Sequence, residues 1–447
     1  MPFNKMLKKY SIRAAALLAG IVGLVIVINL SWFDEPLRPE LARLTFTQDV
    51  SMEGNAYALL LGITAARDRD PASVGKAIVE RLRERYRKGE RIALTSAELD
   101  QIRGGSEFDG TDAAWRSGLW PLDCNSRLML DCATALLTVV GETPTVHPDL
   151  TLLLDRYETI LNTPRFAEME EGDAYTPIPA YSHAIALSRI RLAKSLLRDS
   201  TPDFLERASE DFEFWRRVLR DGNSLVAKMV GIAGMRNNME LLSWLLANRH
   251  LDTRETETLR RIAAPLTDQE RDIGEVFLSE LRLSMLSDKD LVVMLGDSSP
   301  SISLTLQENA TLNEYFLTTV QSLQLRAAMN PEAFARARAN EPVVYRLRRF
   351  PPPLYNLGGK LVLKRMATEY RFQDYITRVH DHVGRMELLL LQTEIEDQPE
   401  TPIATVVRRS RHRNPYTGEP MQYDAEAGTL SFECLSNNET DICAVAL

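Results

Sequence analysis

Hydrophobic residues recur every three or four positions over most of the chain after residue 70, which is the spacing of one face of an α-helix. Within residues 72–88 they stand at Val74, Ile78, Leu82 and Tyr86. The same pattern predicts further helices over 150–161, 184–197, 224–246, 268–287 and 375–396. Because short loops separate many of these segments, we expect a mainly α fold, an irregular array of antiparallel helical hairpins.

One hydrophobic run has no polar face. Residues 14–33 read AAALLAGIVGLVIVINLSWF and contain no charged residue. A helix of that length reaches about 30 Å, the thickness of the hydrocarbon core of a bilayer. Four basic residues precede the run, and Asp34 and Glu35 follow it. The sequence therefore predicts a single transmembrane helix over 14–33, with residues 1–13 as a cytoplasmic tail and the body on the far side of the membrane.

A cleaved signal peptide is the alternative interpretation of this run. Cleavage requires small residues just beyond the apolar core, but residues 28–32 read INLSW. Both interpretations export the body. We expect a juxtamembrane linker over 34–54, because its prolines prevent the helix from continuing, then a helical domain over 55–400 and a tail over 401–447.

The end of the chain changes character to short β-segments. TLSFE and ICAV read as strands, and they flank a ten-residue stretch with Cys434 and Cys443 at its ends. A hairpin would place the two sulfurs opposite each other, so we expect a disulfide. Cys124 and Cys132 form a second candidate pair, which requires a turn between them because eight residues of helix would hold them about 12 Å apart. Zinc is the weaker alternative, since no histidine lies nearby in sequence.

Composition and charge narrow the class of protein. The chain has 447 residues, 45% of them hydrophobic and 26% charged, which is typical of folded domains and excludes low-complexity and disulfide-dense classes. Its formal net charge is −9 although residues 1–13 carry four basic residues. The body is therefore strongly acidic and repels phosphate backbones, so nucleic acid is not an expected partner.

The sequence contains no recognisable catalytic constellation. A nucleophile elbow, a P-loop and a dinucleotide-binding glycine motif are all missing. His380-Asp381-His382 is the only histidine cluster, and residues two apart on a helix point in different directions, so we expect no shared metal. Glu168 opens an acidic run with Glu170, Glu171 and Asp173, which we interpret as a solvated surface, with weak cation binding as the alternative. No catalytic, cofactor-binding or metal-ligating residue is predicted.

One surface is a candidate contact site. Arg408, Arg409, Arg411 and Arg413 form a compact basic patch just before the β-tail, and Tyr416 follows it. Such a patch suits anionic lipid headgroups or an acidic partner surface.

Several phrases of the sequence resemble a known group of proteins. They are NAYALLLG, the Cys124…Cys132 pair, FWRRVL…GNSLVAKMVGIA, LYNLGGKL with YITRVHD, and NPYTGEPMQYD…GTLSFE. Together they resemble an uncharacterised family of bacterial envelope proteins with one amino-terminal transmembrane helix. The resemblance implies an inner-membrane setting. Because that family has no assigned activity, it implies no catalytic residue.

Two functions are compatible with these observations. The first is a non-enzymatic binding or scaffold component of the cell envelope, anchored in the bilayer through residues 14–33 and facing an unidentified envelope protein partner. The second is a membrane-tethered hydrolase of an envelope polymer or peptide. A hydrolase would require a deep pocket with an acid/base pair of shifted pKa values.

Overall fold

The structure is a computed structural model of the chain. It describes residues 2–45, 49–90, 92–105, 108, 129–142, 147–169, 176–286, 305–340, 354–369, 372–436 and 443–447. For residues 2–12, 31, 45, 129–131, 283–286 and 366–369 only the backbone is described.

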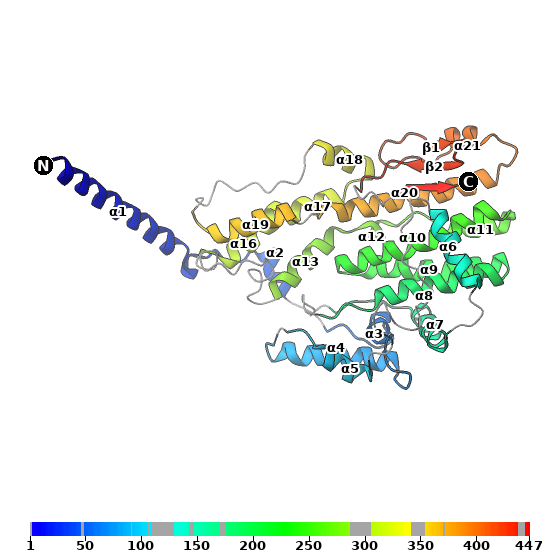
Figure 1. Cartoon of the computed structure of the whole chain (residues 1–447), viewed down its shortest axis with the longest axis horizontal. Helices are drawn as coiled ribbons and strands as arrows, with labels where there is room; N and C mark the ends of the chain where they lie inside the picture. Colours follow the sequence, from blue (N-terminus) through cyan, green and yellow to red (C-terminus); the bar gives the residue numbers. More distant parts are fainter. Residues whose placement is uncertain are drawn as a thin grey trace.

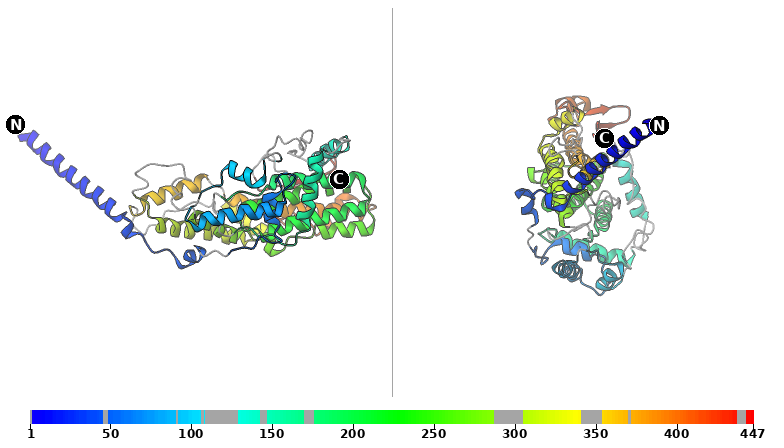
Figure 2. Two further views of the ribbon diagram at one scale, coloured as in Figure 1. Left: turned by 90° about the horizontal axis from the view of Figure 1, so that it is seen from below. Right: turned by 90° about the vertical axis from the view of Figure 1, so that its left-hand side faces the viewer.

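The fold is mainly helical with a small antiparallel sheet at the carboxyl end, as the sequence predicts. Helix α1 projects from one end of an elongated body, and the carboxyl terminus lies in the distant half of that body (Figure 1; Figure 2). The first part of the chain forms α1 (Pro2–Ile28), η1 (Ser31–Phe33), α2 (Pro39–Ala42), η2 (Arg43–Thr45), α3 (Ala56–Gly62), α4 (Pro71–Arg87) and α5 (Ser96–Arg103).

The remaining elements build the rest of the body. The middle of the chain forms α6 (Met129–Glu142), α7 (Pro148–Leu161), α8 (Tyr181–Arg198), α9 (Thr201–Asp221), α10 (Leu225–Asn248), α11 (Thr253–Ile262), α12 (Asp268–Arg271) and α13 (Gly274–Leu286). The last part forms α16 (Glu308–Tyr315), η5 (Phe316–Val320), α17 (Gln321–Ala327), α18 (Pro331–Asn340), α19 (Leu357–Glu369), α20 (Gln373–Glu396), α21 (Ile403–Arg409), β1 (Gln422–Asp424), β2 (Thr429–Phe432) and β3 (Cys443–Ala446).

Helix α10 lies at the centre of the body, where it packs against α6, α8, α9 and α20. Its most extensive contact is with α9, which contributes the fully buried side chain of Trp215. A Cβ atom at Gly234 would overlap the indole ring of Trp215, so only glycine allows this contact. The predicted hairpin array is thus organised around one buried helix.

Local sequence signals set most helix boundaries. Ser224 caps α10 by accepting the backbone amide of Ala227 (3.1 Å). Asp252 and Glu255 form a capping box at the start of α11. The helix expected over 268–287 is instead two helices, because Asp272 ends α12 and accepts the amide of Gly274 (2.8 Å) at the start of α13.

The carboxyl-terminal hairpin and one disulfide are confirmed. Strands β2 and β3 pair antiparallel with Phe432 opposite Cys443, and β1 adds to the free edge of β2. Cys434 and Cys443 are bonded, with their Cα atoms 5.7 Å apart. Cys132 is also disulfide-bonded, whereas Cys124, its expected partner, lies outside the described residues.

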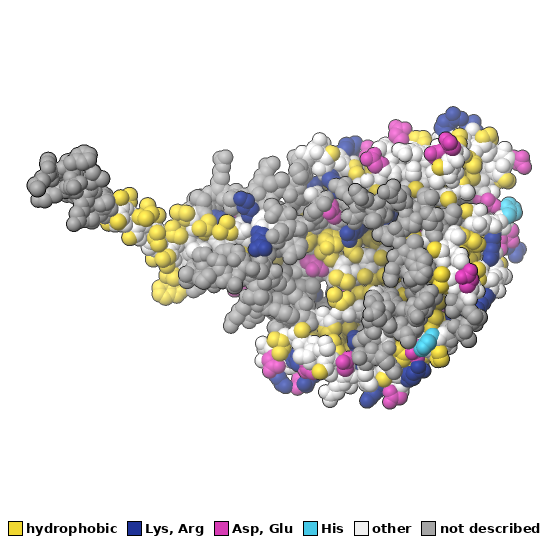
Figure 3. Space-filling view, viewed as in Figure 1, with side chains coloured by type: hydrophobic (Ala, Val, Ile, Leu, Met, Phe, Trp, Pro, Cys, Tyr) yellow, Lys and Arg dark blue, Asp and Glu magenta, His cyan; other side chains and the backbone are white. Residues whose placement is uncertain are grey.

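The predicted transmembrane segment differs from the structure in extent. Helix α1 ends at Ile28, and residues 29–33 form a turn and η1 instead of further helix. Its apolar side chains face outward, with Leu17 68% and Leu24 61% exposed, and Figure 3 shows this apolar surface along the projecting helix. In the part of the chain that the structure describes, no helix combines the length and the hydropathy needed to cross a bilayer.

The end of the predicted transmembrane segment and the start of the expected linker are folded onto the body. Asn29 donates to the carbonyl of Leu354 (2.9 Å) and accepts the amide of Asn356 (2.8 Å). The carboxylate of Asp34 accepts the amides of Asn309 and Ala310 (2.9 and 3.0 Å) in the first turn of α16. These bonds join the base of α1 to the body at several points, so its connection is not an open linker.

Candidate ligand-binding site

A cavity of about 180 Å³ opens at the amino end of α10. Its walls come from α3, α8, α10 and α13 and from the two segments that precede α8 and α10. The side chains that carry chemistry there are Glu168, Tyr181, Glu280 and Arg282. Three of these four come from regions that had shown no candidate residue in the sequence.

Asn55 positions the segment that carries Glu168. Its side-chain nitrogen donates to the carbonyl of Ala167 (2.8 Å), and its side-chain oxygen accepts the amide of Ala167 (3.0 Å). The amide of Ala56 donates to the carbonyl of Arg165 (2.8 Å). Asn55 is also the cap of α3, so residues 165–167 are held at the start of that helix and Glu168 points to the start of α10.

Glu168 and Glu280 both satisfy the amino end of α10. Oε2 of Glu168 accepts the amides of Asn223 and Ser224 (2.7 and 2.9 Å), and its Oε1 accepts the hydroxyl of Ser224 (2.7 Å). Oε1 of Glu280 accepts the amide of Leu225 (2.8 Å). Carboxylates are favoured at a helix amino terminus, where the unpaired amides and the helix dipole are positive.

The pKa values of the two carboxyl groups are both raised. Burial raises the pKa of Glu168, against the hydrogen bonds from Ser224 and Asn223. Burial also raises the pKa of Glu280, and the charge of Glu168 raises it further. Behind them Lys228 is buried and donates to the carbonyl of Leu219, and burial lowers its pKa to about 8. Two carboxyl groups therefore line the cavity, and the ammonium group of Lys228 interacts with Glu168 from outside its lining.

Tyr181 and Arg282 bring unused hydrogen-bonding capacity to the cavity. Tyr181 is 4% exposed, and its hydroxyl has no hydrogen-bond partner among the residues that the structure describes. Nε of Arg282 is likewise buried without a partner in that part of the chain. A buried hydroxyl without a partner costs about 1–3 kcal/mol, so an orphan group that lines a cavity indicates a place for a ligand or water.

The mouth of the cavity is apolar. Ile178 is 64% exposed and Val226 is 42% exposed, and both line the opening. A bound molecule can therefore place a short apolar body against them and direct polar groups inward. This combination is typical of small-ligand sites, which have mainly apolar walls and a few placed polar groups.

The predicted surface contact is only partly at the surface. Arg408, Arg409 and Arg411 are exposed and Arg413 is half-buried, at the end of α21 and just beyond it. The prediction that Tyr416 belongs to a surface contact is wrong, because Tyr416 is 7% exposed and its hydroxyl donates to Asp381 (2.5 Å). It belongs to the core of the tail and not to an exposed recognition surface.

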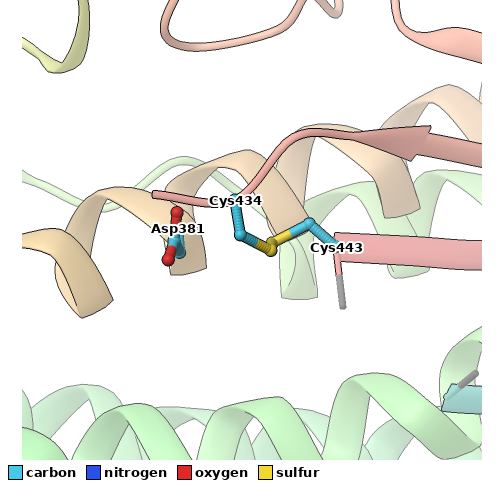
Figure 4. A group of neighbouring side chains, drawn as sticks. All are labelled: Asp381, Cys434 and Cys443. Carbon is cyan, nitrogen blue, oxygen red and sulfur yellow. A yellow bond between two sulfur atoms is a disulfide. The ribbon is translucent and has the colours of Figure 1, made fainter. Parts of the chain in front are cut away.

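The histidine cluster is buried in α20. His380 packs on the ring of Phe334 (4.9 Å between centroids), and His382 is fully buried. Asp381 lies beside Cys434 and Cys443, and Figure 4 shows its carboxylate next to their disulfide. Because the two sulfurs are bonded to each other, they are not thiolate ligands for a metal.

The interpretation of the acidic run is wrong for its first residue. Glu168 is 9% exposed and hydrogen-bonded, and it is not part of a solvated surface. Glu170, Glu171 and Asp173 lie outside the described residues. The sequence contained one signal of this burial, because Glu168 stands between the hydrophobic residues Phe166 and Met169. Both of these residues are buried in the structure.

Comparison of the chain with known protein families, with curated protein sequences and with solved structures finds no match.

Proposed function

We propose that the chain is a membrane-anchored binding protein of the bacterial envelope. Residues 14–33 would be held in the inner membrane, with the tail of residues 1–13 in the cytoplasm and the body in the periplasm. The outward apolar side chains of the projecting α1 support this placement, because an isolated helix with exposed Leu17, Leu18 and Leu24 is unfavourable in water. The disulfide between Cys434 and Cys443 supports export, since such bonds persist in oxidising compartments.

The observation that carries a binding role is the cavity at the amino end of α10, where the buried hydroxyl of Tyr181 has no partner among the described residues. Side chains of both charges line the cavity, since Glu280 and Arg282 are both part of its wall. An amino-acid-like ligand fits this arrangement. Its ammonium group would meet Glu280, its carboxylate would meet Arg282, and its side chain would lie against Ile178 and Val226.

Hydrolysis is the alternative function, and the raised pKa values of Glu168 and Glu280 favour it. Both oxygens of Glu168, however, accept bonds from Asn223 and Ser224, and Glu280 accepts the amide of Leu225. These contacts give the carboxylates a structural role at the start of α10. Ser224 is committed in the same way, because its oxygen accepts the amide of Ala227. The balance of these contacts supports binding over catalysis.

A ligand screen tests the pocket. We expect one or more standard L-amino acids to stabilise the full-length protein in detergent, by about 2.7 kcal/mol at a hundredfold excess over the dissociation constant. Tyr181→Phe should weaken that ligand about threefold to tenfold while leaving the free energy of unfolding unchanged within about 0.5 kcal/mol, because no hydrogen bond to described residues is lost. Isothermal titration calorimetry and chemical unfolding measure the two quantities.

Glu280→Gln separates the two functions. The amide oxygen of glutamine can still accept the amide of Leu225, so the fold should persist while the negative charge is lost. Binding of the amine should then weaken about tenfold. The binding role fails if no amino acid binds or if both variants bind as the parent does. Turnover of a peptide substrate by the parent, abolished in Glu280→Gln, would establish the hydrolase instead.

A fusion of alkaline phosphatase to the carboxyl end tests the anchor and the topology. We expect the fusion to be active and to sediment with membranes, because residues 14–33 export and retain the body. The control lacks residues 1–33 and should be inactive and remain in the soluble fraction. An inactive full-length fusion at normal expression would contradict the periplasmic location, and an active fusion in the soluble fraction would indicate cleavage.

A further inference from the structure

The apolar part of α1 is shorter than a bilayer requires. Within α1, residues 14–28 form an uncharged run of helix that is limited by Arg13 at one end and by the end of the helix at Ile28. This run is about 22 Å long, whereas the hydrocarbon core of a bilayer is about 30 Å thick. If α1 spans the membrane, other apolar groups must fill the remaining thickness or the bilayer must become thinner.

Apolar side chains are exposed immediately beyond α1. Leu30 is exposed in the turn after the helix, and Trp32 and Phe33 are exposed in η1, Trp32 to 88%. Aromatic side chains are favoured at the boundary between lipid and water, tryptophan most clearly. In Figure 3 the apolar surface of α1 continues to the point where that helix meets the body. The apolar run is therefore extended by η1 and the turn before it.

Hydrogen bonds hold a distant segment of the chain against this region. The side chain of Asn29 bonds to the backbone of Leu354 and of Asn356, and the hydroxyl of Tyr355 donates to the carbonyl of Phe33 (3.0 Å). Leu354 is 44% exposed, so its side chain adds to the apolar surface beside η1. With α1 in a membrane, residues 354–356 would lie at the depth at which α1 ends.

Helix α19 begins directly after this segment and has an exposed apolar position. It packs on α16, and both helices lie at the end of the body where α1 joins (Figure 1; Figure 2). Val362 and Leu363 are buried, whereas Leu361 is exposed. Leu361 follows Leu357 by about 6 Å of helix, and the headgroup layer on each side of a bilayer is about 5–7 Å thick. Leu361 therefore stays within reach of that layer even if α19 runs straight away from the membrane.

We propose that the base of the body is a second lipid contact, seated in the interfacial layer of the membrane that α1 crosses. This basal surface consists of Trp32, Phe33, Leu354 and Leu361. The inference rests on the proposed anchor and deepens it. Lipid is the occupant because the surface is continuous with the apolar side chains of α1 and begins where the uncharged helix falls short of the bilayer thickness. Apolar side chains inserted into the interface gain free energy in proportion to the area that they remove from water.

Fluorescence quenching by labelled lipids tests the basal surface. Leu354→Cys and Leu361→Cys each carry an environment-sensitive fluorophore in the full-length protein, in phosphatidylcholine vesicles with or without a nitroxide on the headgroup. Both positions are exposed, so the substitutions should leave the fold intact. We expect the nitroxide lipid to reduce each fluorescence by about half, because label and nitroxide then share one layer. The parent protein, treated with the same reagent, gives the background from its own cysteines.

Two further variants provide the controls. Leu197→Cys is the matched one, since Leu197 is 42% exposed in the last turn of α8. Leu196 beside it accepts a bond from Arg249 (2.6 Å), just before α11, which Figure 1 places at the end of the body away from α1. The label on Leu197→Cys should not be quenched. Leu24→Cys in α1 reports on the anchor itself, and its label should be quenched by a nitroxide placed deep in the acyl chains.

Stronger quenching of both basal labels than of the label on Leu197→Cys supports the lipid contact. The proposal is overturned, while the anchor stands, if Leu24→Cys is quenched and either basal label is quenched no more than Leu197→Cys. It is also overturned if a basal label is shielded from iodide in water but is not quenched by lipid, because a second copy or another protein then covers the surface. An unquenched label on Leu24→Cys would remove the anchor and the contact together.

Discussion

Replacing Asp211 with alanine is expected to destabilise the body by about 2–3 kcal/mol. Asp211 is 0% exposed in α9, and it joins three helices. The hydroxyl of Tyr157 in α7 and that of Ser188 in α8 donate to its Oδ1 (2.6 and 2.7 Å), and Arg191 of α8 donates to its Oδ2 (2.7 Å). Alanine would leave the buried hydroxyl of Tyr157 without its acceptor. Arg191 would keep Glu158 and Glu210, and Ser188 would keep Asn238, but each would lose one strong hydrogen bond.

The raised pKa of Asp211 does not change the sign of the expected loss of stability. Burial raises the pKa of Asp211 to about 6, although Arg191 and the two hydroxyls act to lower it. The carboxylate is thus largely ionised at pH 7.5, where the comparison should be made. Chemical unfolding of the full-length protein in detergent, followed by far-ultraviolet circular dichroism, measures the loss.

A matched substitution on the same helix provides the control. Glu206 is an exposed residue of α9, and Glu206→Ala should change the free energy of unfolding by no more than about 0.5 kcal/mol. Asp211→Asn should fall between the two, because the amide oxygen can still accept the hydroxyl of Tyr157 while the charge is lost. Equal effects of Asp211→Ala and Glu206→Ala would show that the network contributes nothing beyond a surface carboxylate.

The second large effect is the contribution of His380 and His382 to stability, which is lost in mild acid. Asp211, Glu168 and Glu280 act in the opposite direction, because their raised pKa values let the folded chain bind protons as the pH falls. Burial lowers the pKa of His380 to about 4 and that of His382 to about 3. An unfolded histidine titrates near 6.5. As the pH falls below 6.5, these histidines therefore bind protons in the unfolded chain but not in the folded chain. The free energy of unfolding decreases by about 1.4 kcal/mol per pH unit for each histidine.

The expected loss between pH 6.5 and pH 4 is about 3 kcal/mol for each of the two histidines. His382→Leu tests this directly, because the ring nitrogens have no partner among the described residues and no hydrogen bond to those residues is lost. Its unfolding free energy should depend less steeply on pH by about 1.4 kcal/mol per unit over this range. The control is Arg254→Gln, since Arg254 is exposed on α11 and arginine does not titrate in this range, so the slope should stay unchanged. A slope unaltered in His382→Leu would refute the assignment.

Features set by local sequence could be predicted well. The apolar spacing of Val74, Ile78 and Leu82 identified α4, and Ser224 marked the start of α10. Capping and amphipathic periodicity act over a few residues, so the sequence displays them directly. The bond between Cys434 and Cys443 belongs to this class, because both cysteines lie where the paired strands β2 and β3 are connected, nine residues apart in the sequence.

The candidate pocket could not be predicted, because its residues meet only through long-range packing. Glu168 bonds to Ser224, 56 residues later, and Leu225 bonds to Glu280, 55 residues later. A glutamate in an acidic run looks solvated until a helix terminus is placed against it. Tyr416 was misjudged for the same reason, since its acceptor Asp381 lies 35 residues earlier in α20.

The contacts at the base of α1 have a mechanical consequence. Asn29 and Asp34 are bonded to Leu354, Asn356 and the start of α16. With α1 embedded in lipid, its inclination would be transmitted to the globular part, because these hydrogen bonds fasten the residues at its base to the body. The thickness of the surrounding bilayer, which governs how far a spanning helix leans, would then set the direction in which the cavity faces.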